Sequence, residues 1–159
     1  MTPSGNTILI TGGSSGIGLA LALAFQAQGN TVLIAGRRQA ALDTAVSAHP
    51  GLTGHVLDVD DPASIRAFAQ TVMRDHPGLN VLINNAGIMQ AEDLTAADPA
   101  KAEAMVTTNL LGPIRLTAAL LPHLLAQPAA TIVNVTSGLA FVPLALTPTY
   151  SATKAALHS

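Results

Sequence analysis

The chain has 159 residues, of which 49% are hydrophobic and only 10% are charged, so it is long enough for the core of one domain and too short for two. Its formal net charge of -2 and the lack of a Lys- or Arg-rich stripe argue against nucleic-acid binding. There is no cysteine for disulfides or thiolate metal sites, and the five histidines lack metal-ligand spacing. With no apolar stretch of membrane length and no signal-peptide pattern, we expect a cytoplasmic protein without a metal or a membrane partner.

A glycine-rich segment joins the first predicted strand to the first predicted helix. The aliphatic run 7–10 precedes the segment 11–18 (TGGSSGIG), and helix formers follow from Leu19 to Phe25. In this context, glycines let a pyrophosphate approach the free N–H groups at a helix N-terminus. Because Leu19 follows Gly18, the Lys-Ser/Thr pair of a nucleoside triphosphatase P-loop is missing. We therefore predict a cofactor turn, with a tight packing elbow as the alternative, made of Gly12, Ser14, Ser15, Gly16, Ile17 and Gly18.

The second predicted strand, residues 31–35, ends in Gly36, Arg37 and Arg38. A dinucleotide fold places its ribose-reading residue here, and a carboxylate at this point would favour NAD. Two arginines can instead form charge-assisted bonds to a 2′-phosphate, so NADP is the favoured cofactor. The alternative, which we consider more for Arg38 than for Arg37, is an arginine that starts the next helix and faces water.

Two further predicted strands end in polar or small residues. Residues 54–57 lead into Asp58 and Val59, where a carboxylate can accept a bond from an adenine amino group. Asp61 is a plausible helix N-cap with Pro62 in the first turn. The strand 80–83 leads into a small, polar segment where the backbone can pass close to a ligand, with the candidate cofactor residues Asn85, Ala86 and Gly87.

The rest of the chain continues the alternation of strands and helices. A long helix is predicted near residues 99–125 and a fifth strand over 131–135. This rhythm predicts an α/β fold with a doubly wound parallel sheet and ligands at the carboxyl ends of its strands. One apolar stripe of the long helix is expected to be mainly core, with excess width that could face a partner subunit: Met105, Val106, Leu110, Ile114, Leu121, Leu124 and Leu125.

The only tyrosine, Tyr150, stands four residues before Lys154, one of two lysines. Residues four apart share a helix face, so the ammonium can lie beside the phenol and favour its ionised form. That pairing suits proton transfer at neutral pH. Ser137 follows the fifth strand and can reach the same cleft. Taken alone, each of these residues could instead belong to a solvated helix face or cap a turn.

Together these segments resemble the short-chain dehydrogenase/reductase family in its single-domain Rossmann form. The resemblance rests on residues 11–18, residues 84–87, and the set Asn109, Ser137, Tyr150 and Lys154, which follow the family's order and spacing. It implies strand order 3-2-1-4-5 and an NADP-dependent oxidoreductase, acting on a small ketone or secondary alcohol, that assembles as a homo-oligomer.

The same resemblance implies a role for each catalytic residue. Tyr150 would be the general acid/base, and Ser137 would hydrogen-bond the substrate oxygen. Lys154 would hold the nicotinamide ribose and favour the ionised tyrosine, and Asn109 would order a proton-relay water. A non-catalytic NADP-binding module or pseudoenzyme subunit is the alternative function.

The chain departs from this family at its C-terminus. It stops at Ser159, nine residues after Tyr150, whereas family members continue through two more strands and a mobile loop over the substrate. The fifth strand would then form a bare sheet edge. We expect a fragment of a longer reductase, with coverage of that edge by another subunit as the alternative.

Overall fold

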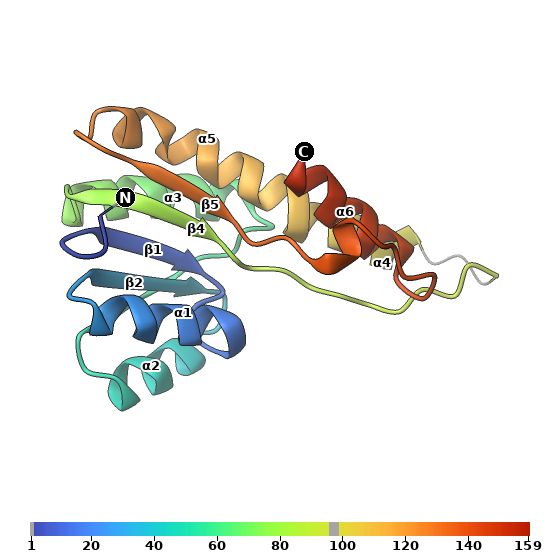
Figure 1. Cartoon of the computed structure of the whole chain (residues 1–159), viewed down its shortest axis with the longest axis horizontal. Coiled ribbons are helices and arrows are strands. Elements are labelled where there is room, and N and C mark those ends of the chain that lie inside the picture. Colours follow the sequence, from blue (N-terminus) through green and yellow to red (C-terminus); the bar gives the residue numbers. More distant parts are fainter. Residues whose placement is uncertain (1, 96–98) are drawn as a thin grey trace.

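The computed structural model describes residues 2–95 and 99–159, in which five parallel strands form one sheet (Figure 1). Their order, β3-β2-β1-β4-β5, confirms the predicted doubly wound Rossmann topology. The predicted strands match the observed ones within two residues at each end. The observed strands are β1 Thr7–Thr11, β2 Thr31–Gly36, β3 Leu52–Val56, β4 Leu79–Asn84 and β5 Thr131–Asn134.

Helices cover both faces of the sheet and divide its core in two. Helices α1 (Gly16–Ala27) and α2 (Gln39–Ala48) pack on one face, and α3 (Pro62–Asp75) and α5 (Gly112–Leu125) pack on the other (Figure 1). Successive strand residues point to opposite faces, so Ile8 and Ile10 join the first core cluster while Leu9 joins the second. This explains why the strand runs are continuously apolar rather than alternating.

The start of α3 matches the sequence prediction. Asp61 is its N-cap, and the Asp61 carboxylate accepts hydrogen bonds from the amides of Ala63 (2.8 Å) and Ser64 (3.2 Å). Pro62 occupies the first turn, where no intrahelical N–H bond is lost. The cap fixes where the chain leaves the β3 end of the sheet, beside the candidate cofactor residues Asp58 and Val59.

The predicted long helix is interrupted in its middle. Helix α4 (Pro99–Val106) passes through one π-helical turn, η1 (Thr107–Leu111), before α5 begins. A π turn adds a residue to the helix, so the face presented to the core rotates by about 100° downstream of it.

The predicted core stripe of this helix is therefore wrong for three of its seven members, while Val106 and Leu110 are half-buried. Of its members, Met105 and Leu124 are fully buried, but Ile114 and Leu125 are 54% and 75% exposed, and Leu121 is also exposed. After the π turn the buried leucines are Leu124 and two residues outside the predicted stripe, Leu116 and Leu120.

The expectation that the chain has no apolar stretch of membrane length is also wrong. The helical run Pro99–Leu125 is long and apolar enough to cross a membrane, with a mean hydropathy of 1.3, whereas no such stretch was predicted. Core helices of soluble proteins meet the same criterion, and α5 packs its Leu116, Leu120 and Leu124 against the sheet. The segment is therefore weak evidence for a membrane span.

The last elements lie beyond the carboxyl ends of β4 and β5. A single 3-10 turn, η2 (Gly138–Ala140), precedes helix α6 (Pro148–His158), which packs against α4, η1 and η2 (Figure 1). Tyr150 and Lys154 are on α6. The fold thus brings the last helix of the chain to the same edge of the sheet as the glycine-rich turn.

Candidate active site

The glycine-rich turn between β1 and α1 needs glycine at specific positions. Gly12 and Gly16 have φ of +66° and +54°, in the left-handed region that favours glycine. At Gly18 the reason is space, because a Cβ there would collide with the carbonyl oxygen of Gly12 and the side-chain amide of Asn85. The turn therefore packs directly against the segment that follows β4.

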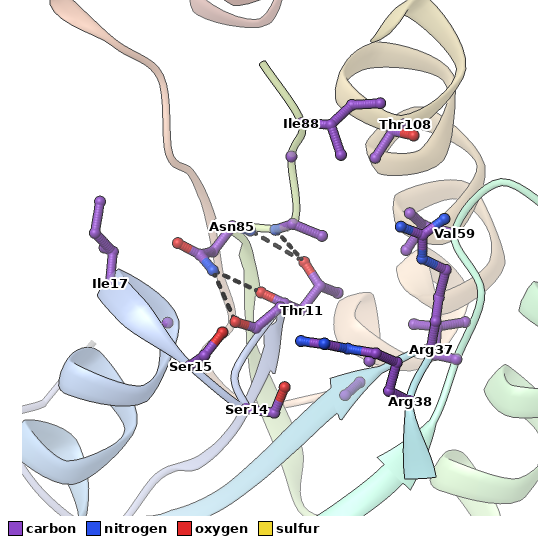
Figure 2. Close-up of a pocket in the computed structure, with 17 residues that line it drawn as sticks. Thr11, Ser14, Ser15, Ile17, Arg37, Arg38, Val59, Asn85, Ile88 and Thr108 are labelled. Atoms are coloured by element: carbon purple, nitrogen blue, oxygen red, sulfur yellow. Dashed lines mark hydrogen bonds between the residues drawn. The ribbon is translucent and has the colours of Figure 1, made fainter. Parts of the chain in front are cut away.

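Hydrogen bonds between Thr11 and Asn85 join these two segments (Figure 2). The Thr11 hydroxyl accepts from the backbone amides of Asn85 and Ala86, both at 3.0 Å. In return, the Asn85 side-chain amide donates to the carbonyl oxygen of Thr11 at 2.8 Å. These bonds fix the carboxyl ends of β1 and β4 relative to each other.

A cleft of about 490 Å³ opens above this junction. Of the predicted cofactor residues, Gly16, Asp58 and Lys154 do not line it. Asp58 instead accepts a bond from the amide of Asp60 at 3.0 Å. Sequence reasoning missed other residues of the cleft wall, among them Leu57, Ile88 and Thr108. The predicted residues that do line it are Gly12, Ser14, Ser15, Ile17, Gly18, Arg37, Arg38, Val59, Asn85, Ala86 and Gly87.

The two arginines after β2 lie differently in the cleft. Arg38 extends into it toward Ser14, whereas Arg37 follows the wall toward Thr108 (Figure 2). Arg37 Nη1 lies 3.4 Å from Oδ2 of Asp60, and the Thr108 hydroxyl donates to Asp60 Oδ1 at 2.7 Å. Asp60 thus offers Arg37 a carboxylate at the rim of the cleft.

The cleft has the donors that an anionic ligand needs. Ser15 caps α1 by position, but its side chain makes no capping hydrogen bond. The free amides of the first turn of α1 and the positive end of its dipole face the same space. Together with Arg38, they make this wall suited to a pyrophosphate or phosphate.

A second hollow of about 190 Å³ adjoins the cleft and contains the predicted proton-transfer pair. Tyr150 and Lys154 line it, together with Met89, Val135 and Thr136. Ile17, Asn85, Gly87 and Ile88 line both the cleft and the hollow. A ligand that spans the two spaces would therefore bring one end to Tyr150 and Lys154.

The Lys154 ammonium is hydrogen-bonded to the backbone of the residue that follows β5. The ammonium donates to the Val135 carbonyl oxygen at 2.8 Å and lies 5.8 Å from the centre of the Tyr150 ring. The side chain is only 4% exposed, and this burial lowers the pKa of Lys154 below its ordinary value.

Asn109 and Ser137, the other two predicted catalytic residues, do not line the hollow. Asn109, fully buried in the π turn, accepts from the Ile88 amide (2.8 Å) and donates to the Ile88 carbonyl (2.9 Å) and the Thr153 hydroxyl (3.2 Å). Ser137 accepts from the Leu139 amide at 3.2 Å and so caps the η2 turn. In this structure Asn109 joins the segment after β4 to α6, and Ser137 retains a hydroxyl proton to donate.

Over residues 2–95 and 99–159, no group of three or more His, Cys, Asp or Glu side chains is placed to hold an ion.

Adding one methyl group at Gly18 tests the close packing of the turn. We expect Gly18→Ala to lower the free energy of unfolding by about 1–3 kcal/mol, as overpacking does. Gly138→Ala is the control, since its Cβ would meet no atom within 4 Å, and it should change stability by less than about 0.5 kcal/mol. Urea unfolding of both variants measures the difference, and equal losses would contradict the packing argument.

Replacing Lys154 tests its burial through the pH dependence of stability. The folded chain releases the Lys154 proton at a lower pH than the unfolded chain, whose lysine pKa is 10.5. Between these two pKa values the unfolded chain binds more protons, so Lys154 makes the free energy of unfolding rise with pH. Urea unfolding from neutral pH toward 10.5 should show a flatter slope in Lys154→Met.

The exposed Lys101 supplies the control for this measurement. Lys101→Met should keep the wild-type slope. If Lys154→Met and wild type had the same slope, the burial of the ammonium would not affect stability as described.

Comparisons with known proteins agree with this architecture. The uncharacterized oxidoreductase DltE of Bacillus subtilis is 45% identical over 164 residues, which cover all of this chain and 64% of the relative. The NADPH-dependent 1-acyldihydroxyacetone phosphate reductase of Schizosaccharomyces pombe is 41% identical over 155 residues, or 94% of this chain and 50% of the relative.

Solved structures show the same fold. L-Sorbose reductase from Gluconobacter frateurii, complexed with NADPH and L-sorbose, superimposes with a TM-score of 0.90 at 31% identity, over 97% of this chain and 60% of that chain. A short-chain dehydrogenase from Streptomyces avermitilis gives a TM-score of 0.89 at 37% identity, over 96% of this chain and 56% of that chain.

The chain thus spans between half and two thirds of the length of these relatives. A family model described as short chain dehydrogenase matches residues 6–159, which include the glycine turn, the Asn85 segment and the Tyr150–Lys154 pair. The chain therefore belongs to the short-chain dehydrogenase/reductase family.

Proposed function

We propose that the protein is an oxidoreductase that uses NADPH to reduce a small ketone, or NADP⁺ to oxidise the corresponding secondary alcohol. The observation that carries the proposal is the junction of the two hollows: Tyr150 and Lys154 face a space that shares Asn85, Gly87 and Ile88 with the phosphate-suited cleft. A dinucleotide in the cleft would present its reactive end to a proton donor.

The residues present fit such a cofactor. A Cβ at Gly18 would fill the turn, and the amides at the start of α1 together with Ser14 and Ser15 can receive the pyrophosphate. Val59, which follows β3, lines the cleft where the adenine would lie, whereas the Asp58 carboxylate accepts from the Asp60 amide. The buried Lys154 ammonium can donate to a ribose hydroxyl in the second hollow while it keeps its bond to Val135.

The preference for NADP over NAD rests on charge. No carboxylate follows β2; instead Arg37 and Arg38 line the cleft. Their forked guanidinium groups suit a 2′-phosphate, which a carboxylate at this position would repel. The NADPH-dependent reductase of Schizosaccharomyces pombe and the NADPH complex of the Gluconobacter enzyme support the same preference.

The chain's own chemistry in the reaction is proton transfer. The bound nicotinamide supplies or accepts the hydride. Tyr150 Oη gives its proton to the carbonyl oxygen during reduction and takes it back during oxidation. Lys154, close to the Tyr150 ring, stabilises the phenolate left after proton donation. The Ser137 hydroxyl keeps its proton while it caps η2 and can donate it to the same substrate oxygen, and Asn109 keeps α6 beside Ile88.

The residues around the second hollow indicate the class of substrate. Met89 lines the second hollow, which gives it an apolar wall. Phe141 and Val142 are exposed on the neighbouring loop, and Leu139 lies in the η2 turn. We infer an uncharged, partly apolar carbonyl compound, acted on by a cytoplasmic protein. A homo-oligomer fits the exposed Ile114, Leu121 and Leu125 on α5.

The alternative is a module that binds NADP without turnover. It requires the same cleft but gives no role to the placement of Tyr150 and Lys154 beside it. NADPH binding without oxidation of NADPH across a panel of aldehydes and ketones would favour this alternative.

Reversing the charge at the cleft rim tests the cofactor preference. Arg37→Asp should weaken NADPH binding by about tenfold or more and leave NADH favoured, since a charge-assisted contact contributes about 1.5–3 kcal/mol. Arg38→Asp should act in the same direction, because its side chain extends into the cleft. Arg66→Asp, at an exposed position of α3, is the control. Fluorescence titration of both dinucleotides decides, and an unchanged preference in both cleft variants would rule the assignment out.

Removing the tyrosine hydroxyl tests the proton-transfer role. Tyr150→Phe should lower kcat by about 100-fold or more, because the positioned acid is lost. The Kd for NADPH should stay within about twofold, since the hydroxyl does not hold the dinucleotide. Steady-state NADPH oxidation and a binding titration measure both quantities. If the variant retained more than about a tenth of the wild-type kcat, the acid/base role would belong to another group.

A further inference from the structure

Glu92, in the segment after β4, contacts the start of the helix that carries Tyr150. Its carboxylate accepts from the backbone amide of Thr149 at 2.9 Å (Oε1) and from the Thr149 hydroxyl at 2.7 Å (Oε2). The Glu92 amide donates to the Leu146 carbonyl at 3.0 Å. Three hydrogen bonds therefore join residues that are more than fifty positions apart in the chain.

The start of α6 has no cap of its own. Thr147 holds the N-cap position, but its side chain makes no capping bond. Its hydroxyl is buried, with 3% of the residue exposed, and has no partner among residues 2–95 and 99–159. The first amides of a helix need an acceptor, and a carboxylate is favoured there by the helix dipole. Glu92, from another part of the chain, supplies the acceptor and the negative charge.

This contact bears directly on the second hollow. Thr149 immediately precedes Tyr150, so a shift of the first turn of α6 moves the phenol. The segment that carries Glu92 also carries Met89 in the wall of the hollow and Ile88, whose peptide groups Asn109 binds. The segment is thus held to α6 at two places: through Asn109 to Thr153 near the middle of the helix, and through Glu92 at its start.

We propose that Glu92 is a positioning residue, which caps α6 in trans and so sets the place of the Tyr150 hydroxyl relative to the wall of the substrate hollow. The proposal rests on the proposed function for its effect on turnover. Glu92 does not line the cofactor cleft, so its loss acts on the reaction step and leaves dinucleotide binding intact.

Three variants of the purified protein test this assignment. Glu92→Ala removes both bonds to Thr149, and we expect kcat for NADPH oxidation to fall at least tenfold, since displacements of about 1 Å can cost about 100-fold. Glu92→Gln keeps an acceptor for the amide and a donor for the hydroxyl, so it should stay within about threefold of wild type. Glu103→Ala removes an exposed carboxylate of α4 and should leave kcat unchanged. The Kd for NADPH should be the same in all four proteins.

A second measurement tests the capping of α6 by Glu92 independently of turnover. Hydrogen–deuterium exchange of the peptide 148–158 should be faster in Glu92→Ala than in wild type, Glu92→Gln and Glu103→Ala. Wild-type kcat and wild-type exchange in Glu92→Ala would overturn the proposal, and so would a loss of NADPH affinity as large as the loss of kcat. Wild-type protein that binds NADPH but does not oxidise it with any ketone tested would show that the proposed function fails. If exchange of the peptide 148–158 is still faster in Glu92→Ala, the capping role of Glu92 stands.

Discussion

The hydrogen bonds between Thr11 and Asn85 are the contact on which the rest of the site depends. They join the carboxyl ends of β1, the central strand of the sheet, and its neighbour β4. The glycine turn leaves from one of these strands, and the segment that separates the cofactor cleft from the second hollow leaves from the other. Because Gly18 packs on the Asn85 side chain, the start of α1 is fixed by the same contact. The cleft is thus defined by main-chain positions rather than by flexible side chains.

A second set of contacts positions the proposed proton-transfer residues, Tyr150 and Lys154, relative to the ends of β1 and β4. Lys154 is anchored to Val135 at the end of β5, and Asn109 holds Ile88 with both ends of its amide. Asn109 can do so because the π turn opens the helix at its position and directs the buried amide toward α6. A buried ammonium next to a phenol is costly unless it is bonded, and here the Val135 carbonyl meets that need. The π turn thus serves to place the Asn109 amide, and the Val135 carbonyl makes the buried Lys154 ammonium tolerable.

Much of this could be predicted from local sequence. Continuous aliphatic runs indicated the buried parallel strands, and the turn 11–18 and the pair Tyr150–Lys154 indicated the two ends of the site. The turn and the pair can be recognised locally because each depends on residues close in the sequence: glycines at a strand-to-helix turn, or two side chains one helical turn apart. The N-cap at Asp61 could be predicted for the same reason, because it depends only on Asp61 and the residues next to it.

What could not be predicted depends on register or on long-range contacts. The π turn rotates α5, so the expected stripe through Ile114, Leu121 and Leu125 faces outward and Leu116 and Leu120 form the core. Asp60 pairs with Arg37 across 23 positions, and Glu92 bonds Thr149 across 57, distances at which a single sequence carries no pairing signal. Thr11 stood within the recognised turn, and only the fold shows that its hydroxyl binds Asn85.

We propose that a hydride passes between the dinucleotide in the cleft and a carbonyl carbon held beside Tyr150. Mass spectrometry of the product formed with NADPH deuterated at C4 of the nicotinamide tests it most directly, with a panel of small uncharged ketones as acceptors. We predict an alcohol that carries one deuterium on the carbinol carbon. Binding of the deuterated NADPH without deuterium in any alcohol product would contradict it.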